Sequence, residues 1–315
     1  MRVVRQDVYG GPEVLRVVEV DDPEPGPTEV LVRVHAAGVN PVDWKVRAAP
    51  GFFDHTPFTV GWDVSGVVEA VAPGVTRFVP GDELFGMPWF PREAAAYADY
   101  VTAPSRQFAR KPAALTHLEA GGLPLAGLTA WQILVDTADV QPGQRVLITA
   151  AAGGVGHLAV QIAKARGAHV VGTARAAKHD FLRELGADEV IDYTAVDVAA
   201  ATGDIDVVVD ALGGESSLQV MPTLKPGGLL IPVTGGSDDE IEVAARDQGV
   251  HLALFLVEPD HVGLEALAAL ADAGQLRVEI DAVFPLEQVA AAHERGETGR
   301  TRGKIVLAVD QTALA

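Results

Sequence analysis

The stretch Ala150-Ala151-Ala152-Gly153-Gly154-Val155-Gly156 decides the fold. It follows the apolar run Arg145–Thr149 and precedes a segment with the apolar spacing of a helix. A strand, a glycine-rich turn and a helix in this order are typical of the phosphate-binding turn of a doubly wound sheet, here with Ala151 in the first glycine position. Gly153 lets the backbone approach a pyrophosphate, Gly156 lets helix and strand pack closely, and the helix N-terminus favours phosphate. The alternative is a tight turn without a ligand.

Outward from this turn, strand-like and helix-like patterns alternate along the chain. Short apolar runs indicate buried strands, and Gly167 and Gly186 stand where two intervening helices should stop. This alternation predicts a parallel sheet with helices on both faces. The expected strands are Arg145–Ala150, His169–Thr173, Glu189–Asp192, Asp206–Asp210, Gly228–Val233 and His251–Leu256, and the expected helices include Pro124–Thr137, His157–Arg166 and His179–Leu185.

Both chain ends have a different pattern. Glu29–His35 alternates polar and apolar residues, and Pro-Gly pairs mark turns between further short strands, which indicates a β-rich domain. The tail adds a helical segment at Leu286–Glu294 and a strand at Gly303–Val309, which we expect to return to the first domain. The predicted fold class is α/β. A β-rich domain from residues 1–122 and 280–315 encloses a doubly wound domain from residues 123–279.

Composition excludes several classes of function. The 315 residues are 48% hydrophobic and 21% charged, as in globular proteins, and no run of about 18 apolar residues predicts a membrane span. The absence of cysteine excludes disulfides, thiolate zinc sites and iron–sulfur clusters. The net charge of −19 disfavours nucleic acid and anionic membranes as partners. The N-terminus shows no secretory leader, and we expect a cytoplasmic protein.

The end of the second expected strand predicts the cofactor. Binders of NAD place an acid about 20 residues after the glycine loop, whereas Thr173–His179 contains Arg175 and Lys178 and no acid. Two cations can pair with a 2′-phosphate, so the sequence favours NADPH. The alternative is a solvated helical turn with incidental cations. Tyr193, after the third strand, is expected either near the cofactor phosphates or in ordinary packing.

Small residues also follow the fourth and fifth expected strands. Ligands of doubly wound sheets bind outside the carboxyl ends of the strands, so these turns outline one crevice. Each turn taken alone is equally consistent with an ordinary loop. The predicted cofactor-binding residues are Ala152, Gly153, Gly154, Val155, Gly156, Thr173, Arg175, Lys178, Tyr193, Ala211, Leu212, Val233, Thr234, Gly303 and Lys304.

Several motifs together resemble the zinc-free quinone oxidoreductases (zeta-crystallin-like) of the medium-chain dehydrogenase/reductase family. The resemblance covers essentially the whole chain. It is carried by His35–Lys45, Gly61–Val68, Val79–Gly86, Leu128–Trp131, Ala152–Ala163 and Gly303-Lys304.

This resemblance implies a GroES-like β-rich domain, a Rossmann domain, and hydride transfer from NADPH to a quinone, enone or aldehyde. Zinc-dependent relatives carry a His-Glu pair where this chain has Trp62-Asp63, so no metal is expected. Many relatives carry a tyrosine in the loop that reads Gly51-Phe52-Phe53 here, and often Ser or Asn where Arg175 and Lys178 stand.

Four polar residues are candidates for catalysis. Asn40, the only asparagine, can donate to a substrate oxygen as negative charge develops, or it can cap a helix before Pro41. Asp43 can orient Lys45 or act as a cap. Thr129 can contact the nicotinamide amide or bond back to its own helix.

Aromatic and apolar residues give two further predictions. Phe52, Phe53, Trp62 and Phe255 are candidates for a substrate pocket, although aromatic residues are more often core. The apolar run His251–Val257 reads as a last strand whose edge needs covering, either by a second copy in a homodimer or by the helix Val262–Ala271.

Three alternative functions share parts of this pattern. An enoyl reductase acting on unsaturated thioesters has the same fold and cofactor. A non-enzymatic NADPH-binding protein predicts binding without turnover. A methyltransferase has a similar glycine loop, but the β-rich half and the cations at Arg175 and Lys178 argue against it.

Overall fold

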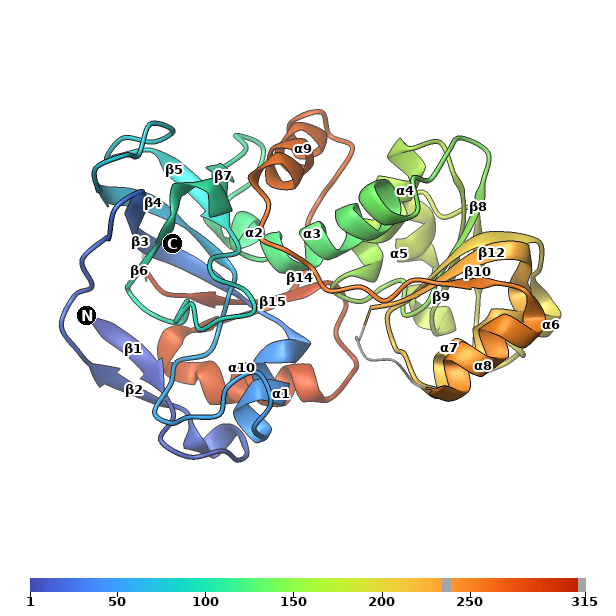
Figure 1. The fold of residues 1–315 in the computed structure, drawn as a ribbon, viewed down its shortest axis with the longest axis horizontal. Coiled ribbons are helices and arrows are strands. Elements are labelled where there is room, and N and C mark those ends of the chain that lie inside the picture. Colours follow the sequence, from blue (N-terminus) through green and yellow to red (C-terminus); the bar gives the residue numbers. More distant parts are fainter. Residues whose placement is uncertain (234–238, 311–315) are drawn as a thin grey trace. The chain divides into compact units, whose positions relative to one another are not determined.

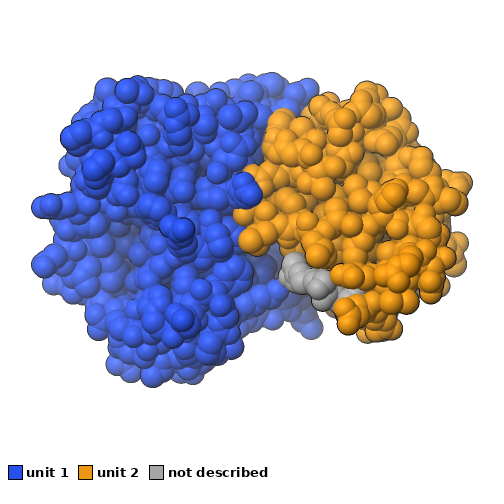
Figure 2. All heavy atoms as spheres, in the orientation of Figure 1, with its two compact units in different colours: residues 1–128, 258–315 blue, residues 129–257 orange. Residues whose placement is uncertain are grey.

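The computed structural model describes residues 1–233 and 239–310 (Figure 1). The chain divides into two compact units (Figure 2). Unit 1 comprises Met1–Leu128 and Glu258–Ala315, and unit 2 comprises Thr129–Val257.

Unit 1 is built on a seven-stranded sheet. Its strand order is β14-β15-β3-β4-β5-β7, with β6 also paired to β3. The strands are β3 (Glu29–Val39), β4 (Val64–Val71), β5 (Glu83–Gly86), β6 (Tyr100–Pro104), β7 (Phe108–Arg110), β14 (Ile280–Pro285) and β15 (Lys304–Ala308), and β1 (Arg2–Arg5) pairs with β2 (Arg16–Glu19) in a separate sheet. The helices are α1 (Pro41–Ala48), α2 (His117–Gly121), α3 (Pro124–Trp131, which continues into unit 2), α9 (His261–Asp272) and α10 (Val289–Glu297).

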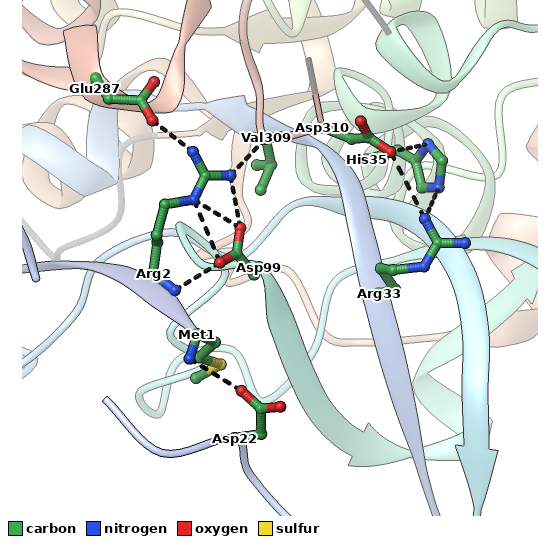
Figure 3. Close-up of polar contacts among 9 residues, drawn as sticks. All are labelled: Met1, Arg2, Asp22, Arg33, His35, Asp99, Glu287, Val309 and Asp310. Carbon is green, nitrogen blue, oxygen red and sulfur yellow. Dashed lines mark hydrogen bonds and ion pairs between the residues drawn. The ribbon is translucent and has the colours of Figure 1, made fainter. Parts of the chain in front are cut away.

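The two chain ends meet in this unit, as the sequence predicts. Strand β15 pairs antiparallel with β3, with Ile305 opposite Val39. Arg2 donates to Asp99 at 2.7 Å, to Glu287 and to the Val309 carbonyl at 2.9 Å, so one guanidinium joins both ends of the chain (Figure 3). The GroES-like arrangement of the β-rich part is confirmed.

Unit 2 is a six-stranded parallel sheet. The strand order is β10-β9-β8-β11-β12-β13, so the order reverses between β8 and β11. The strands are β8 (Arg145–Ile148), β9 (His169–Thr173), β10 (Glu189–Ile191), β11 (Ile205–Asp210), β12 (Leu224–Pro232) and β13 (His251–Leu252). The helices are α4 (Gly156–Ala165), α5 (His179–Glu184), α6 (Val198–Ala201), α7 (Glu215–Val220) and α8 (Asp239–Gln248), and α3 passes into a π-helical turn at Gln132–Thr137. The predicted doubly wound sheet is confirmed.

Apolar residues in register on neighbouring strands bury one face of this sheet. Each of four neighbouring strands contributes one fully buried residue to the same core cluster, namely Leu147, Val171, Val208 and Leu230. Their continuous apolar runs are typical of strands covered on both faces. Because the strands are parallel, their carboxyl ends lie at the same edge of the sheet.

The compact units do not end where the sequence predicts the domains to end. They divide after Leu128 and after Val257, whereas the predicted boundaries follow residues 122 and 279. Helix α9 accounts for the second difference, because it packs against β7 and its Glu265 pairs with Arg77 in unit 1. As boundaries of folding domains, 122/123 and 279/280 stay a prediction.

The strand predicted at His251–Leu256 is mostly wrong. Only His251 and Leu252 pair with β12, and Leu254 and Leu256 are each 56% exposed beyond it. Apolar composition therefore overestimated the strand, since a run of this kind cannot by itself show where pairing stops.

Candidate nucleotide-binding and active site

The phosphate-binding turn has the predicted strand–turn–helix context. It connects β8 to α4, and the Gly153 N–H donates to the Ala150 carbonyl at 2.8 Å. Ala150 itself has φ +44°, a left-handed conformation that an alanine adopts at some cost. A Cβ on Gly156 would lie 2.5 Å from the Ala150 oxygen and 2.6 Å from the Ala151 Cα, so only glycine fits there.

The surface of the turn is open where a diphosphate would bind. A Cβ on Gly153 would meet one atom only, the Ala150 oxygen at 3.1 Å, and residues Gly153, Gly154 and Val155 are partly exposed. Helix α4 begins at Gly156, directly after these exposed residues, so the positive end of its dipole lies at this open surface. The residues present therefore fit a dinucleotide.

The end of β9 presents a cation to solvent. Thr173 is buried as the last strand residue, and the exposed Arg175 follows it. The Tyr193 hydroxyl lies 3.4 Å from the Arg175 Nε, so the two side chains that the sequence predicts near the cofactor come together. Lys178 is half-buried at the end of a short 3₁₀ turn. This arrangement favours a ligand with an additional anionic group.

An acid that lies beside this strand end in the fold is already engaged in hydrogen bonds. Asp192, after β10, accepts from the Thr194 hydroxyl at 2.6 Å and from the Ala176 N–H at 3.1 Å. These hydrogen bonds, first of all those from Thr194, hold the pKa of Asp192 below its usual value. Asp192 thus stabilises the turn after β9.

The turn after β11 is organised around Asp210, which is fully buried. Ala211 is partly exposed and Leu212 is 58% exposed above it. Val233, after β12, donates its N–H to the Asp210 carbonyl at 2.9 Å. Thr234, also predicted to bind the cofactor, lies outside the described residues.

In unit 1, Asn40 lies in a buried polar cluster. Its Nδ2 donates to Asp63 Oδ2 at 2.8 Å, its Oδ1 accepts from the Lys304 ammonium, and the residue is 1% exposed. The sequence alternative also holds, because Asn40 is the N-cap of α1 and its N–H donates to Asp43 Oδ2 at 2.6 Å. Capping and side-chain chemistry are therefore combined in one residue.

The predicted pairing of Asp43 with Lys45 is wrong. Asp43 is fully buried and accepts from the Tyr97 hydroxyl at 2.6 Å, whereas Lys45 is exposed. Residues two apart on a helix point to different sides, which explains the separation. Thr129 is 3% exposed in α3. The catalytic roles of these residues stay predictions.

Gly303 and Lys304 are built into the same part of unit 1. A Cβ on Gly303 would lie 2.2 Å from the Glu279 oxygen, and its φ is +78°. The Lys304 ammonium is 3.6 Å from Asp63 Oδ2, and its side chain is 2% exposed. Their roles toward the cofactor stay predictions; Lys304 contacts this cluster, whereas Gly303 packs against the backbone of Glu279.

Sequence reasoning missed Asp63 and Tyr97 as members of this cluster. Asp63 interrupts an apolar run between Trp62 and Val64, and a charge in such a run is the signal that identifies it. Gly38 makes room for it, since a Cβ there would lie 2.5 Å from Asp63 Oδ2.

Burial dominates the electrostatics of the cluster. Desolvation raises the pKa of Asp43 to about 7, against the hydrogen bonds from Tyr97 and Asn40. Desolvation also raises the pKa of Asp63 and lowers that of Lys304, and each of these two charges opposes the shift of the other. Nearby, burial and then Arg47 lower the pKa of His293 to about 3.

Three of the four predicted pocket aromatics lie together. Phe52 and Phe53 have ring centroids 6.5 and 5.9 Å from Trp62, and Phe90, which the sequence missed, lies 5.3 Å from Trp62. Phe52 is 47% exposed, whereas Phe53 and Trp62 are buried. Phe255 is half-buried in unit 2, and its place in the pocket stays a prediction.

Within residues 1–233 and 239–310, no three His, Cys, Asp or Glu side chains are placed to hold a metal ion. None of the helices in the part of the chain that the structure describes has the length and apolarity needed to cross a bilayer.

Comparisons with known proteins agree with this architecture. Residues 26–113 match the alcohol dehydrogenase GroES-like domain, and residues 185–307 match a zinc-binding dehydrogenase model. A spinach protein named quinone-oxidoreductase homolog, chloroplastic, is 33% identical over 98% of this chain and 98% of its own. The quinone oxidoreductase structure from Coxiella burnetii has a TM-score of 0.93 at 36% identity, covering 98% of this chain and 99% of its own. The Escherichia coli quinone oxidoreductase complexed with NADPH has a TM-score of 0.87 at 27% identity, covering 98% and 100%.

The fold, the phosphate-binding turn and these similarities define an oxidoreductase with a nicotinamide cofactor. The chain belongs to the medium-chain dehydrogenase/reductase family, in its quinone oxidoreductase group.

The expected cytoplasmic location is wrong by the same comparisons. The spinach relative is named chloroplastic, and a mouse relative 32% identical to this chain is named mitochondrial. The expectation rested on a missing leader pattern and on missing cysteines, and neither observation distinguishes the cytoplasm from the interior of an organelle.

Proposed function

We propose that this protein transfers hydride from NADPH to a quinone or a related α,β-unsaturated carbonyl compound, without zinc. The observation that carries the proposal is the exposed Arg175 with Tyr193 at the end of β9, next to an open phosphate-binding turn. An acid at this strand end would repel a 2′-phosphate, whereas a guanidinium binds it in a fork of two hydrogen bonds.

Each part of the chain then has a defined task. The bound nicotinamide supplies the hydride. The turn around Gly153 holds the diphosphate, and Arg175 and Tyr193 hold the 2′-phosphate. The exposed ring of Phe52, which packs on the buried Trp62, offers an apolar surface to a flat acceptor. Asn40 stays the proposed donor to the acceptor oxygen: one amide N–H is used by Asp63, and we assign the other to the acceptor.

The experiment is a fluorescence titration of NADPH and NADH against wild type and Arg175→Ala. We expect the substitution to weaken NADPH by about 10-fold to 100-fold and NADH by less than about 2-fold. Arg183→Ala is the matched control, because Arg183 is an exposed arginine of the same unit that pairs with Asp180. Equal affinity of the wild type for both cofactors would overturn the assignment.

Turnover is tested by stopped-flow oxidation of NADPH with a benzoquinone, an enone, an aldehyde and an unsaturated thioester. Activity with the thioester alone would favour an enoyl reductase, and binding without any turnover would favour a non-enzymatic role. Unchanged turnover after dialysis against a chelator is expected if zinc has no part in the reaction.

We also propose a homodimer that pairs along β13. This strand ends the order of the sheet, and Leu254 and Leu256 beside it are each 56% exposed. An exposed apolar sheet edge favours pairing with a second copy. Light scattering after size exclusion should give twice the chain mass for wild type and a smaller mass for Leu254→Lys/Leu256→Lys. A monomeric wild type would contradict the proposal.

A further inference from the structure

The order reversal of the parallel sheet lies between β8 and β11, and a single carboxylate joins the two strands there. Thr149 follows β8 and Asp210 ends β11. The Thr149 hydroxyl donates to Asp210 Oδ1 at 2.7 Å, and the Thr149 N–H donates to the Val209 carbonyl at 3.0 Å. In doubly wound sheets this reversal is where a ligand binds, because the loops after the two strands diverge.

Asp210 has many hydrogen-bond donors and no opposite charge. Its carboxylate is fully buried and accepts from the hydroxyls of Thr149, Ser216 and Ser217, at 2.7, 2.9 and 2.7 Å. It also accepts from two backbone N–H groups, those of Leu212 and Gly213, at 3.2 and 3.1 Å. No Lys, Arg or His among the described residues forms an ion pair with it. A buried carboxylate is tolerated when such donors replace water.

The same contacts set the shape of the turn after β11. Three consecutive N–H groups point inward: that of Ala211 to the Thr149 hydroxyl at 2.9 Å, and those of Leu212 and Gly213 to Asp210. Gly213 and Gly214 have φ values of +71° and +58°, which complete the turn. The outer side of the turn is open, since Leu212 is 58% exposed. The buried Asp210 and the hydroxyls that donate to it, which we call the Asp210 cluster, therefore fix the shape of an exposed loop. The sequence predicts that residues of this loop face the cofactor.

We propose that Asp210 and Thr149 are positioning residues for the dinucleotide. They hold the phosphate-binding turn, which begins directly after Thr149, in a fixed position relative to the turn at Ala211–Gly214. They do so without contacting the nucleotide. This inference rests on the proposed nucleotide-binding function. The Asp210 cluster acts on loops that bind the part common to NADPH and NADH. Its loss therefore weakens the binding of both cofactors equally, whereas the loss of Arg175 weakens the binding of NADPH.

The test compares Thr149→Val with Thr149→Ser by fluorescence titration of both cofactors. Valine has the shape of threonine without the hydroxyl, and serine keeps the hydroxyl. We expect Thr149→Val to raise the Kd for NADPH and for NADH by about 10-fold each, and Thr149→Ser to change either by less than about 2-fold. The Thr149→Val/Arg175→Ala double variant should show the product of the two single effects on NADPH, because the sites act independently.

Asp210→Asn and Ser217→Ala extend the test to the carboxylate. The amide of an asparagine at 210 would turn N–H groups toward existing donors, so we expect a larger loss than for Thr149→Val, and a smaller loss for Ser217→Ala. If Asp210→Asn does not fold, the Thr149 pair and Ser217→Ala decide the question. Circular dichroism and a thermal unfolding midpoint well above the titration temperature verify that each variant is folded.

Three outcomes distinguish the explanations. Equal affinities for Thr149→Val and Thr149→Ser would overturn the positioning role. A loss for NADPH alone would overturn it as well, because it would indicate a contact with the 2′-phosphate. Absence of cofactor binding in the wild type would instead refute the proposed function itself.

Discussion

Two buried carboxylates, one in each unit, are stabilised in different ways. Asp63 in unit 1 lies 3.6 Å from the Lys304 ammonium, a partner 241 positions away in the chain, and both side chains are at most 2% exposed. Asp210 in unit 2 accepts from hydroxyls and backbone N–H groups of its own unit. The ion pair in unit 1 joins distant segments of the chain, so we expect its removal to lower the free energy of unfolding. The hydrogen bonds of Asp210 shape an exposed loop, so we expect their removal to lower the affinity for the cofactor.

The largest expected effect comes from breaking the charged pair. Lys304→Met leaves Asp63 buried without its cation, which typically costs about 3–5 kcal/mol of unfolding free energy. Urea denaturation at pH 7.5 measures this loss. The control is Lys304→Met/Asp63→Asn, which removes both charges and should be more stable than the single variant. Equal losses in the two proteins would show that the charge of Asp63 is not what matters.

The pH dependence of stability probes the same cluster. Burial raises the pKa of Asp43 to about 7 in the folded protein, above its unfolded value of 3.8. The folded state therefore holds a proton that the unfolded state has lost, and stability falls as pH rises between these two values, by at most about 1.4 kcal/mol per pH unit. The stabilising contribution is fully present below the unfolded pKa and is lost above pH 7.

Asp43→Asn isolates this effect from the other acids of the chain. An asparagine does not titrate, so the unfolding free energy of wild type minus that of the variant should decline from pH 4 to pH 7 and then stay constant. Acids such as Asp188, whose pKa is lowered by Lys164 and by the Val170 N–H against the opposing effect of burial, cancel in this difference. A difference that does not vary with pH would contradict a raised pKa at Asp43.

The phosphate-binding turn separates packing from binding in the second unit. Gly156→Ala would place a Cβ 2.5 Å from the Ala150 oxygen, a backbone atom that cannot move aside easily, so we expect a loss of about 2–3 kcal/mol in stability. Gly153→Ala meets only one atom, at 3.1 Å, and should fold with less than about 1 kcal/mol lost while binding NADPH more weakly. Unfolding curves and titrations on both variants decide, and a stable Gly156→Ala would refute the close approach.

What the sequence could predict differs between the two units for a physical reason. The turn at Ala150–Gly156 and the cations after Thr173 are local patterns, and their spacing alone implies their geometry. The pairing of Asn40 with Asp63 and Lys304 joins three distant segments, and no local spacing specifies it. The position of Asp63 inside an apolar run was the available signal, but a buried charge does not by itself indicate which residue pairs with it.

Errors at Lys45 and at the last strand have the same origin. The prediction that Asp43 orients Lys45 assumed that residues close in sequence are close in space. Both residues lie in helix α1, where side chains two positions apart point to different sides. The run after His251 was extended by its apolar composition, although pairing with β12 stops at Leu252. Composition and proximity predict the kind of element, whereas its contacts depend on the tertiary fold.

The smallest expected effect tests how Arg175 is held. The Tyr193 hydroxyl lies 3.4 Å from the Arg175 Nε, a long contact between two exposed side chains, and such contacts contribute little to affinity. Tyr193→Phe keeps the ring and removes this contact, so we expect NADPH to bind about 2-fold more weakly and NADH to be unaffected. Tyr193→Ala, which also removes the ring, should weaken NADPH further if the ring packs against the bound nucleotide. If Tyr193→Phe weakened NADPH binding as much as Arg175→Ala does, the Tyr193 hydroxyl would have to bind the 2′-phosphate directly. Arg175 would then not be its main ligand, contrary to the proposal.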